Sequence, residues 1–197
     1  MRHATIRTVI LSVIATCAIL FVAGLVVVYG GFYDVAASDR HWPVTQSLLD
    51  VARAHSIAFH AQGIPVPNKL DTPSNMAMGV DHFAAHCAVC HGAPGVPRDD
   101  IAEGMYPQPP DLKDAAQHYS DAQLFWILKN GIKMTGMPSW ADHGDDDLWA
   151  IVAFLKKLPN MSEADYAKLV MDNAMHGMIH EHGGGQGGDT PNTEASH

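Results

Sequence analysis

Hydrophobic residues are concentrated at the start of the chain. An uncharged run of 26 residues, 8–33, separates Arg7 from Asp34. As an α-helix this run would extend roughly 39 Å, which exceeds the roughly 30 Å hydrocarbon core of a bilayer. The aromatic side chains that close the run are Tyr29, Phe32 and Tyr33. Because such rings suit the membrane interface, we predict that residues 1–33 form a single transmembrane anchor.

The charges that flank this run predict its orientation. Arg2 and Arg7 precede it, whereas no acidic residue occurs before Asp34. The positive-inside rule then places the N-terminus in the cytoplasm and the rest of the chain on the periplasmic side of a bacterial inner membrane. A cleaved signal peptide is the alternative, because residues 35–37 could serve as a cleavage site, although signal peptides normally carry a shorter apolar region. Either route exports most of the chain.

Residues 34–74 are predicted to contain one helix and a linker. The helix covers 44–62, where Pro43 suits a first helical turn and Gly63 suits a helix end. Residues 63–74 hold three prolines and no periodic pattern. This composition is typical of a linker.

Helical patterns dominate the next segment. The stretch 75–86 is predicted to be a helix, and a capping box begins at Ser120. Towards the end of the segment, apolar residues recur at i, i+3, i+4 and i+7: Leu148, Ile151, Val152 and Leu155. Gly79 and Phe83 could let the first of these helices cross the last one closely. We therefore expect residues 75–160 to form a mainly all-α domain.

Residues 161–197 are predicted to begin with a short helix that Ser162 and Asp165 could cap. From about residue 177 the chain is rich in glycine and has few apolar residues to bury. We expect that part to be disordered.

The charge balance restricts the function. All 21 acidic residues lie after residue 33 with 10 of the 12 basic ones, which gives that part a net charge of −11. A nucleic-acid-binding protein needs a basic surface, so we expect no nucleic-acid partner. The same charge predicts a redox partner with a basic docking patch. Three cysteines are too few for a disulfide scaffold.

The most informative motif is Cys87-Ala88-Val89-Cys90-His91, which fits the C-x-x-C-H pattern of haem c attachment. Two thiols three residues apart on a helical turn can both reach the vinyl groups of one porphyrin. The adjacent imidazole is then directed at the iron. We therefore predict one haem c, bound covalently by Cys87 and Cys90, with His91 as an axial ligand of the iron.

Three other interpretations of this motif are weaker. A thioredoxin-like dithiol would lie between a strand and a helix, and no strand pattern precedes Cys87. A structural zinc site would need a second pair of ligands at suitable spacing. A structural disulfide would not explain His91.

A second axial ligand is expected on the distal side of the iron. The downstream candidates are Met105, His118, Met134, Met137 and His143. Met137 is favoured because Gly136 and Pro138 place it on a loop rather than in a packed helix. A thioether opposite an imidazole raises the reduction potential. It also fills the coordination sphere, which favours electron transfer over catalysis.

Residues of about 75–160 resemble class I c-type cytochrome domains of bacteria. The residues that carry this resemblance are Cys87, Cys90, His91, Met137 within Gly136-Met137-Pro138-Ser139-Trp140, the Gly79 and Phe83 pair, and Trp149. The resemblance implies the class I cytochrome c fold. It also implies that a carbonyl in the proline segment, of Pro109 or Pro110, accepts a hydrogen bond from His91. A simple loop-shaping role for these prolines is the alternative.

Three functions remain open at this level. The first is a membrane-anchored electron carrier between a respiratory or dehydrogenase donor and an acceptor. The second is a fixed cytochrome subunit of a larger dehydrogenase or oxidase. The third is a haem sensor or enzyme, which would require an open iron site and therefore the absence of a bond from Met137.

Methionine and histidine are crowded in the C-terminal segment: Met171, Met175, His176, Met178, His180 and His182. Thioethers suit Cu(I), and imidazoles suit copper, nickel or zinc. Metal capture by this segment is one hypothesis, and a copper protein would be a fitting neighbour. The alternative is a polar tail in which these residues occur by chance.

Overall fold

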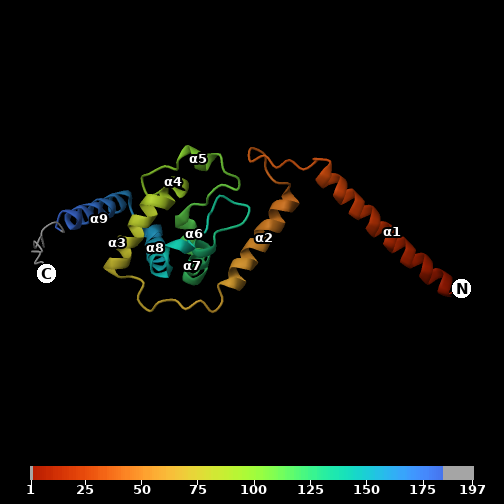
Figure 1. Cartoon of the computed structure of the whole chain (residues 1–197), viewed down its shortest axis with the longest axis horizontal. Coiled ribbons are helices and arrows are strands. Elements are labelled where there is room, and N and C mark those ends of the chain that lie inside the picture. The colour runs from red at the N-terminus through yellow and green to blue at the C-terminus, as the bar shows by residue number, and fades with distance from the viewer. Residues whose placement is uncertain (1, 184–197) are drawn as a thin grey trace, which may run out of the picture. The chain divides into compact units, whose positions relative to one another are not determined.

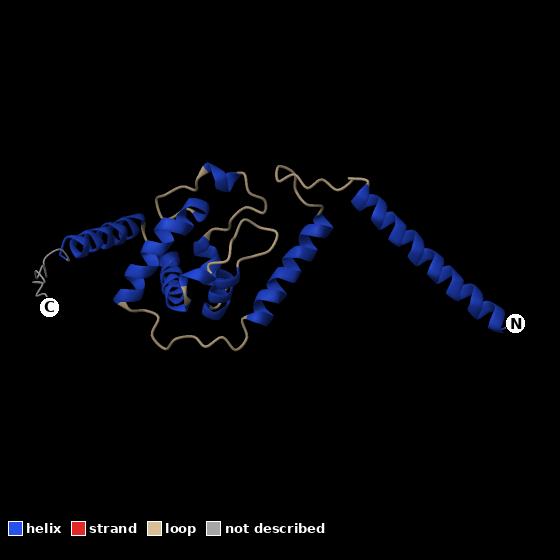
Figure 2. Ribbon diagram, in the orientation of Figure 1, coloured by secondary structure: helices blue, strands red, loops and turns tan. Residues whose placement is uncertain are grey.

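The structure is a computed structural model that describes residues 2–183, with side chains from residue 5 to residue 175. The chain forms two compact units that divide between His41 and Trp42. In the described part every regular element is a helix, and the β pairing consists of one isolated bridge between Ala93 and Val96 (Figure 2). The predicted all-α class is confirmed.

The first unit contains α1 (Arg2–Tyr29), the red helix of Figure 1. Between Thr5 and Tyr29 this helix is long and apolar enough to cross a membrane. None of its central apolar side chains is buried in the protein. A helix with apolar residues on all sides finds a suitable environment in lipid, so α1 is a candidate membrane anchor.

The second unit begins with α2 and contains all the remaining elements. In chain order these are α2 (Pro43–His60), α3 (Pro73–His82), the π-helix η1 (Phe83–Cys87), α4 (Ala88–His91), α5 (Asp100–Glu103), α6 (Leu112–His118), α7 (Asp121–Asn130), the 3₁₀-helix η2 (Ala141–His143), α8 (Asp145–Lys157), the 3₁₀-helix η3 (Leu158–Asn160) and α9 (Glu163–Gly183). The helices predicted over 44–62 and 75–86 correspond to α2 and to α3 with η1. The predicted capping box at Ser120 is present at the start of α7.

The crossing of α3 and α8 forms the centre of the second unit. Gly79 of α3 lies against the backbone of Ala150, and a Cβ atom there would collide with the carbonyl oxygen of Ala150. The rings of Phe83 and Phe154 pack with centroids 4.8 Å apart, and both side chains are fully buried. The predicted close crossing at Gly79 and Phe83 is confirmed.

Helix α2 packs within the second unit rather than in a separate segment. The His60 ring stacks on Trp126 of α7 with centroids 5.6 Å apart. Near the other end of α2, the hydroxyl of Tyr106 donates to Oε1 of Gln46 at 3.0 Å. The expected division at residue 74 therefore differs from the observed one, because aromatic and polar contacts hold this helix on the helical domain.

The C-terminal helix is longer than the sequence suggests. Ser162 caps α9 as predicted, since its Oγ accepts from the backbone N–H of Asp165 at 3.1 Å. The helix continues to Gly183, so the expectation of disorder from residue 177 is wrong for residues 177–183. The rest of the expected tail, 184–197, lies outside the described residues.

Candidate haem site

Cys87 and Cys90 lie at a change of helix type. The π-helix η1 ends at Cys87, and the backbone N–H of Ala88 bonds the carbonyl of Phe83 five residues earlier. Cys87 is 9% exposed and belongs to the hydrophobic core, whereas Cys90 is half-buried. Both carry free thiols. Short π-helical turns are frequent at functional sites, and this one brings the motif directly onto the core.

Burial also distinguishes this pair from a redox-active dithiol. Desolvation, followed by the neighbouring Cys90, raises the pKa of the Cys87 thiol to about 12. Reactive thiols of the thioredoxin type have a lowered pKa instead. The thioredoxin-like interpretation is therefore disfavoured by the structure as well as by the sequence.

The His91 ring is held by the proline segment. Its Nδ1 lies 2.8 Å from the carbonyl oxygen of Pro110. A carbonyl can only accept, so Nδ1 carries the proton and the lone pair is on Nε2, the nitrogen that remains available to a metal. Of the two prolines expected to orient His91, Pro110 makes this bond rather than Pro109.

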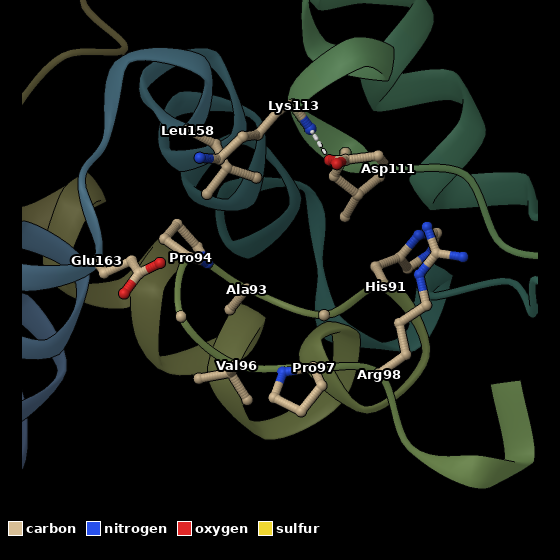
Figure 3. A pocket seen from close by; sticks show the side chains of 13 residues that line it. His91, Ala93, Pro94, Val96, Pro97, Arg98, Asp111, Lys113, Leu158 and Glu163 are labelled. Atoms are coloured by element: carbon tan, nitrogen blue, oxygen red, sulfur yellow. Dashed lines mark hydrogen bonds between the residues drawn. The ribbon is translucent and has the colours of Figure 1, made fainter. Parts of the chain in front are cut away.

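Neighbouring charges act on His91 in opposite directions. Burial is the largest effect and lowers the pKa of the imidazole, and the charge of Arg98 lowers it further. The Pro110 carbonyl and the Asp111 carboxylate raise it. Arg98 and Asp111 line a cavity of ≈ 320 Å³ beside His91 (Figure 3). The net effect favours the neutral imidazole, which is the form that binds iron.

A closed loop positions Met137. Its carbonyl accepts from the backbone N–H of Ile132 at 3.1 Å, and its N–H donates to Oγ1 of Thr135 at 3.1 Å. The same Thr135 hydroxyl donates to the carbonyl of Ile132 at 2.8 Å. The Met137 side chain is half-buried against the core. These bonds hold a thioether in a fixed place outside any helix.

Further bonds fasten this loop to α7. The N–H of Trp140 donates to the carbonyl of Leu128 at 3.0 Å, and Oγ of Ser139 donates to the carbonyl of Lys129 at 2.6 Å. Gly131 has φ +66° and lies against the backbone of Pro138, where a Cβ atom would not fit. The glycine therefore allows the chain to leave α7 and return close to it.

The other candidate ligands lie in different surroundings. Met134 is 71% exposed. The sulfur of Met105 lies against Gly136, where a Cβ atom would be 2.7 Å from it. His118 is exposed on α6. His143, in η2, lies beside His82 and His86. Met137 remains the favoured distal ligand.

Trp140 supplies a further indication of a bound group. Its indole Nε1 is buried and has no hydrogen-bond partner within the described residues. A buried donor of this kind costs free energy unless a partner satisfies it. Haem carries anionic propionates that could accept such a bond. The buried donor, the two thiols, the imidazole and the thioether together fit a haem, with Cys87, Cys90, His91 and Met137 as the residues that would hold it.

The helical fold and this set of donors define a c-type cytochrome domain. Residues 74–155 match the family described as cytochrome c oxidase, cbb3-type, subunit III. This span nearly coincides with the domain predicted at 75–160. The resemblance to c-type cytochromes is confirmed, and these residues form a haem-binding, electron-transfer domain. A search of curated proteins found no match to the chain.

Proposed function

We propose that this protein is a membrane-anchored monohaem cytochrome c that transfers single electrons on the periplasmic side of a bacterial inner membrane. The observation that carries the proposal is the hydrogen bond between His91 and Pro110, one residue after a pair of free thiols. This bond leaves Nε2 of His91 available to the iron of a haem that Cys87 and Cys90 would hold.

Each residue of the site has a separate task. Cys87 and Cys90 would attach the haem through thioether bonds, and Nε2 of His91 would bind the iron. Met137 would supply the second iron ligand and so exclude small molecules from the iron. The haem supplies a one-electron iron couple, and the surrounding chain needs no acid, base or nucleophile for this function.

The covalent attachment can be tested on the full chain produced in a host that matures c-type cytochromes. We expect the mass of the wild-type protein to exceed that of its amino acids by one haem. The double variant Cys87→Ser and Cys90→Ser should lose covalent haem, whereas Cys17→Ser should retain it because Cys17 lies in α1. A colourless wild-type protein with only its polypeptide mass would refute the proposal.

A second candidate function is that of a fixed subunit in a larger oxidase or dehydrogenase. The description of the matching family, an oxidase subunit, favours it. Purification from native membranes in mild detergent distinguishes the two. A stable partner in fixed stoichiometry would support the subunit, and a monomeric cytochrome would support the independent carrier.

A further inference from the structure

Three histidines outside the haem ligands come together at one end of the domain. They are His82 at the end of α3, His86 in η1 and His143 in η2. One ring nitrogen from each lies within 4.8 Å of those of the other two. We refer to these residues as the histidine trio.

The local structure explains why two members share a face. His82 and His86 are four residues apart, a spacing that places two imidazoles on the same side of a helix, as in the zinc-binding H-E-x-x-H motif. Their ring centroids are 6.1 Å apart. This i, i+4 pair stands in the sequence directly before the Cys87–His91 motif.

Tertiary structure supplies the third member. The loop after Met137 returns to α7 through Trp140, and the next turn, η2, carries His143. The His143 ring centroid lies 5.3 Å from that of His82 and 5.5 Å from that of His86. Residues about 60 positions apart in the chain therefore meet at this point.

A carboxylate stands next to the histidine trio. Oδ2 of Asp147, in the first turn of α8, lies 3.6 Å from Nε2 of His82. A carboxylate beside metal-binding imidazoles compensates the positive charge of the ion, and it can also orient a ligating ring.

We propose that the histidine trio binds one divalent transition-metal ion of the class that prefers imidazole, Cu²⁺ or Zn²⁺. Three imidazoles form a recognised zinc site, and copper binds such nitrogen donors more tightly than zinc. Nitrogens bound to one zinc at about 2.0–2.1 Å lie closer together than 4.8 Å, so binding requires small rotations. His86 is the exposed member of the histidine trio. Asp147 or water completes the coordination.

This site is separate from the haem ligands but adjacent to them in the chain. His86 directly precedes Cys87, and His143 follows Met137 by six residues. It also differs from the methionine and histidine cluster of the C-terminal segment, since no member of the histidine trio comes from residues beyond 160. The experiment must therefore separate the two groups of histidines.

The test uses the full-length protein purified without a polyhistidine tag, in a background that carries His176→Gln, His180→Gln and His182→Gln. Zn²⁺ is titrated by calorimetry and Cu²⁺ by electron paramagnetic resonance. We expect one ion per chain, with nitrogen hyperfine structure for Cu²⁺. Tighter binding of one metal identifies which ion the site prefers.

Single substitutions then locate the site. His82→Gln, His86→Gln and His143→Gln should each weaken binding at least tenfold, because each removes one of three ligands. His55→Gln changes an exposed histidine of α2 and should leave the affinity unchanged. The haem absorption spectrum of each variant reports whether the domain is folded, and His86→Gln, at an exposed position, is the variant least able to disturb it.

The proposal is overturned if the background protein binds neither metal. It is also overturned if any one of the three substitutions leaves the affinity unchanged in a folded protein. The proposal is likewise overturned if His55→Gln weakens metal binding as much as the substitutions in the histidine trio do. The metal would then bind surface histidines in general rather than one site.

Discussion

At the scale of single residues, the carbonyl of Pro110 determines which nitrogen of His91 can act as a ligand. The imidazole could present either nitrogen, but the bond of 2.8 Å from Nδ1 leaves the lone pair on Nε2. Asp111 stabilises the segment that supplies this carbonyl, because its side chain caps α6 by accepting from the N–H of Lys113 at 2.8 Å. The cap at Asp111 thus adjoins the Pro110 carbonyl that orients His91, which lies 19 residues before Pro110.

The assignment of Met137 leads to a prediction at this scale. Met137→Ala should remove the near-infrared absorption that arises from methionine bound to ferric iron, and it should produce high-spin iron at neutral pH. The reduction potential should fall by on the order of 100 mV, because a thioether stabilises the ferrous state. Absorption spectra and a redox titration measure these effects.

Met134→Ala is the matched control, since Met134 lies three residues away and is 71% exposed. Its spectrum and potential should equal those of the wild-type protein. If Met134→Ala, rather than Met137→Ala, opened the iron site, the assignment of the distal ligand would be wrong.

At the scale of elements, the packing of α3 against α8 organises the domain. Gly79 lets the two helices approach until backbone meets backbone, and Phe83 and Phe154 fill the space on one side. The same α3 continues through η1 into the two cysteines. A change in this crossing would therefore displace the turn that carries Cys87 and Cys90 as well as the core.

Gly79→Val tests the crossing. A valine Cβ would collide with the Ala150 backbone, so the two helices must move apart. We expect the free energy of unfolding to fall by about 1–3 kcal/mol. Chemical denaturation of the haem-loaded protein measures it. Gly104→Ala is the control, because the nearest atom to a new Cβ there is 3.8 Å away, and it should change stability by less than about 0.5 kcal/mol. Equal stability of the two variants would contradict the close packing.

At the scale of the whole molecule, net charge governs encounter with other redox species. The chain has a formal charge of −9, and the excess of acidic residues lies entirely after α1. Charges of one sign attract oppositely charged partners over distances comparable with the Debye length, and salt screens that attraction. We therefore expect a long-range preference for basic partners.

The reaction with small inorganic oxidants tests this preference. Oxidation of the reduced protein by a cationic complex of higher potential, such as tris(1,10-phenanthroline)cobalt(III), should slow severalfold as salt rises from about 10 mM to 200 mM. The anionic complex ferricyanide is the matched control, and its reaction should become faster as the salt concentration rises over the same range. Stopped-flow absorption gives both rates, and rates independent of salt would show that net charge does not steer the encounter.

The sequence predicted much of the site, because its motifs are local. The spacing of Cys87, Cys90 and His91, the loop around Met137 and the capping box at Ser120 each depend on residues only a few positions apart. The predicted end of the last helix lies too close to the start of the chain. The glycine-rich composition favoured disorder from about residue 177, whereas α9 continues to Gly183. The choice of Pro110 over Pro109 and the position of α2 depended on contacts between distant segments.

By itself the sequence therefore determined a long apolar N-terminal helix and an all-α domain, and it predicted the residues that would hold one haem, since periodicity and short motifs express these features directly. Only the tertiary structure decided which carbonyl orients His91, which helix packs on α7, and that His143 joins His82 and His86. Those outcomes require segments up to about 60 residues apart to meet, and the physical reason is that burial and hydrogen bonding across a core are not encoded in any one stretch of chain.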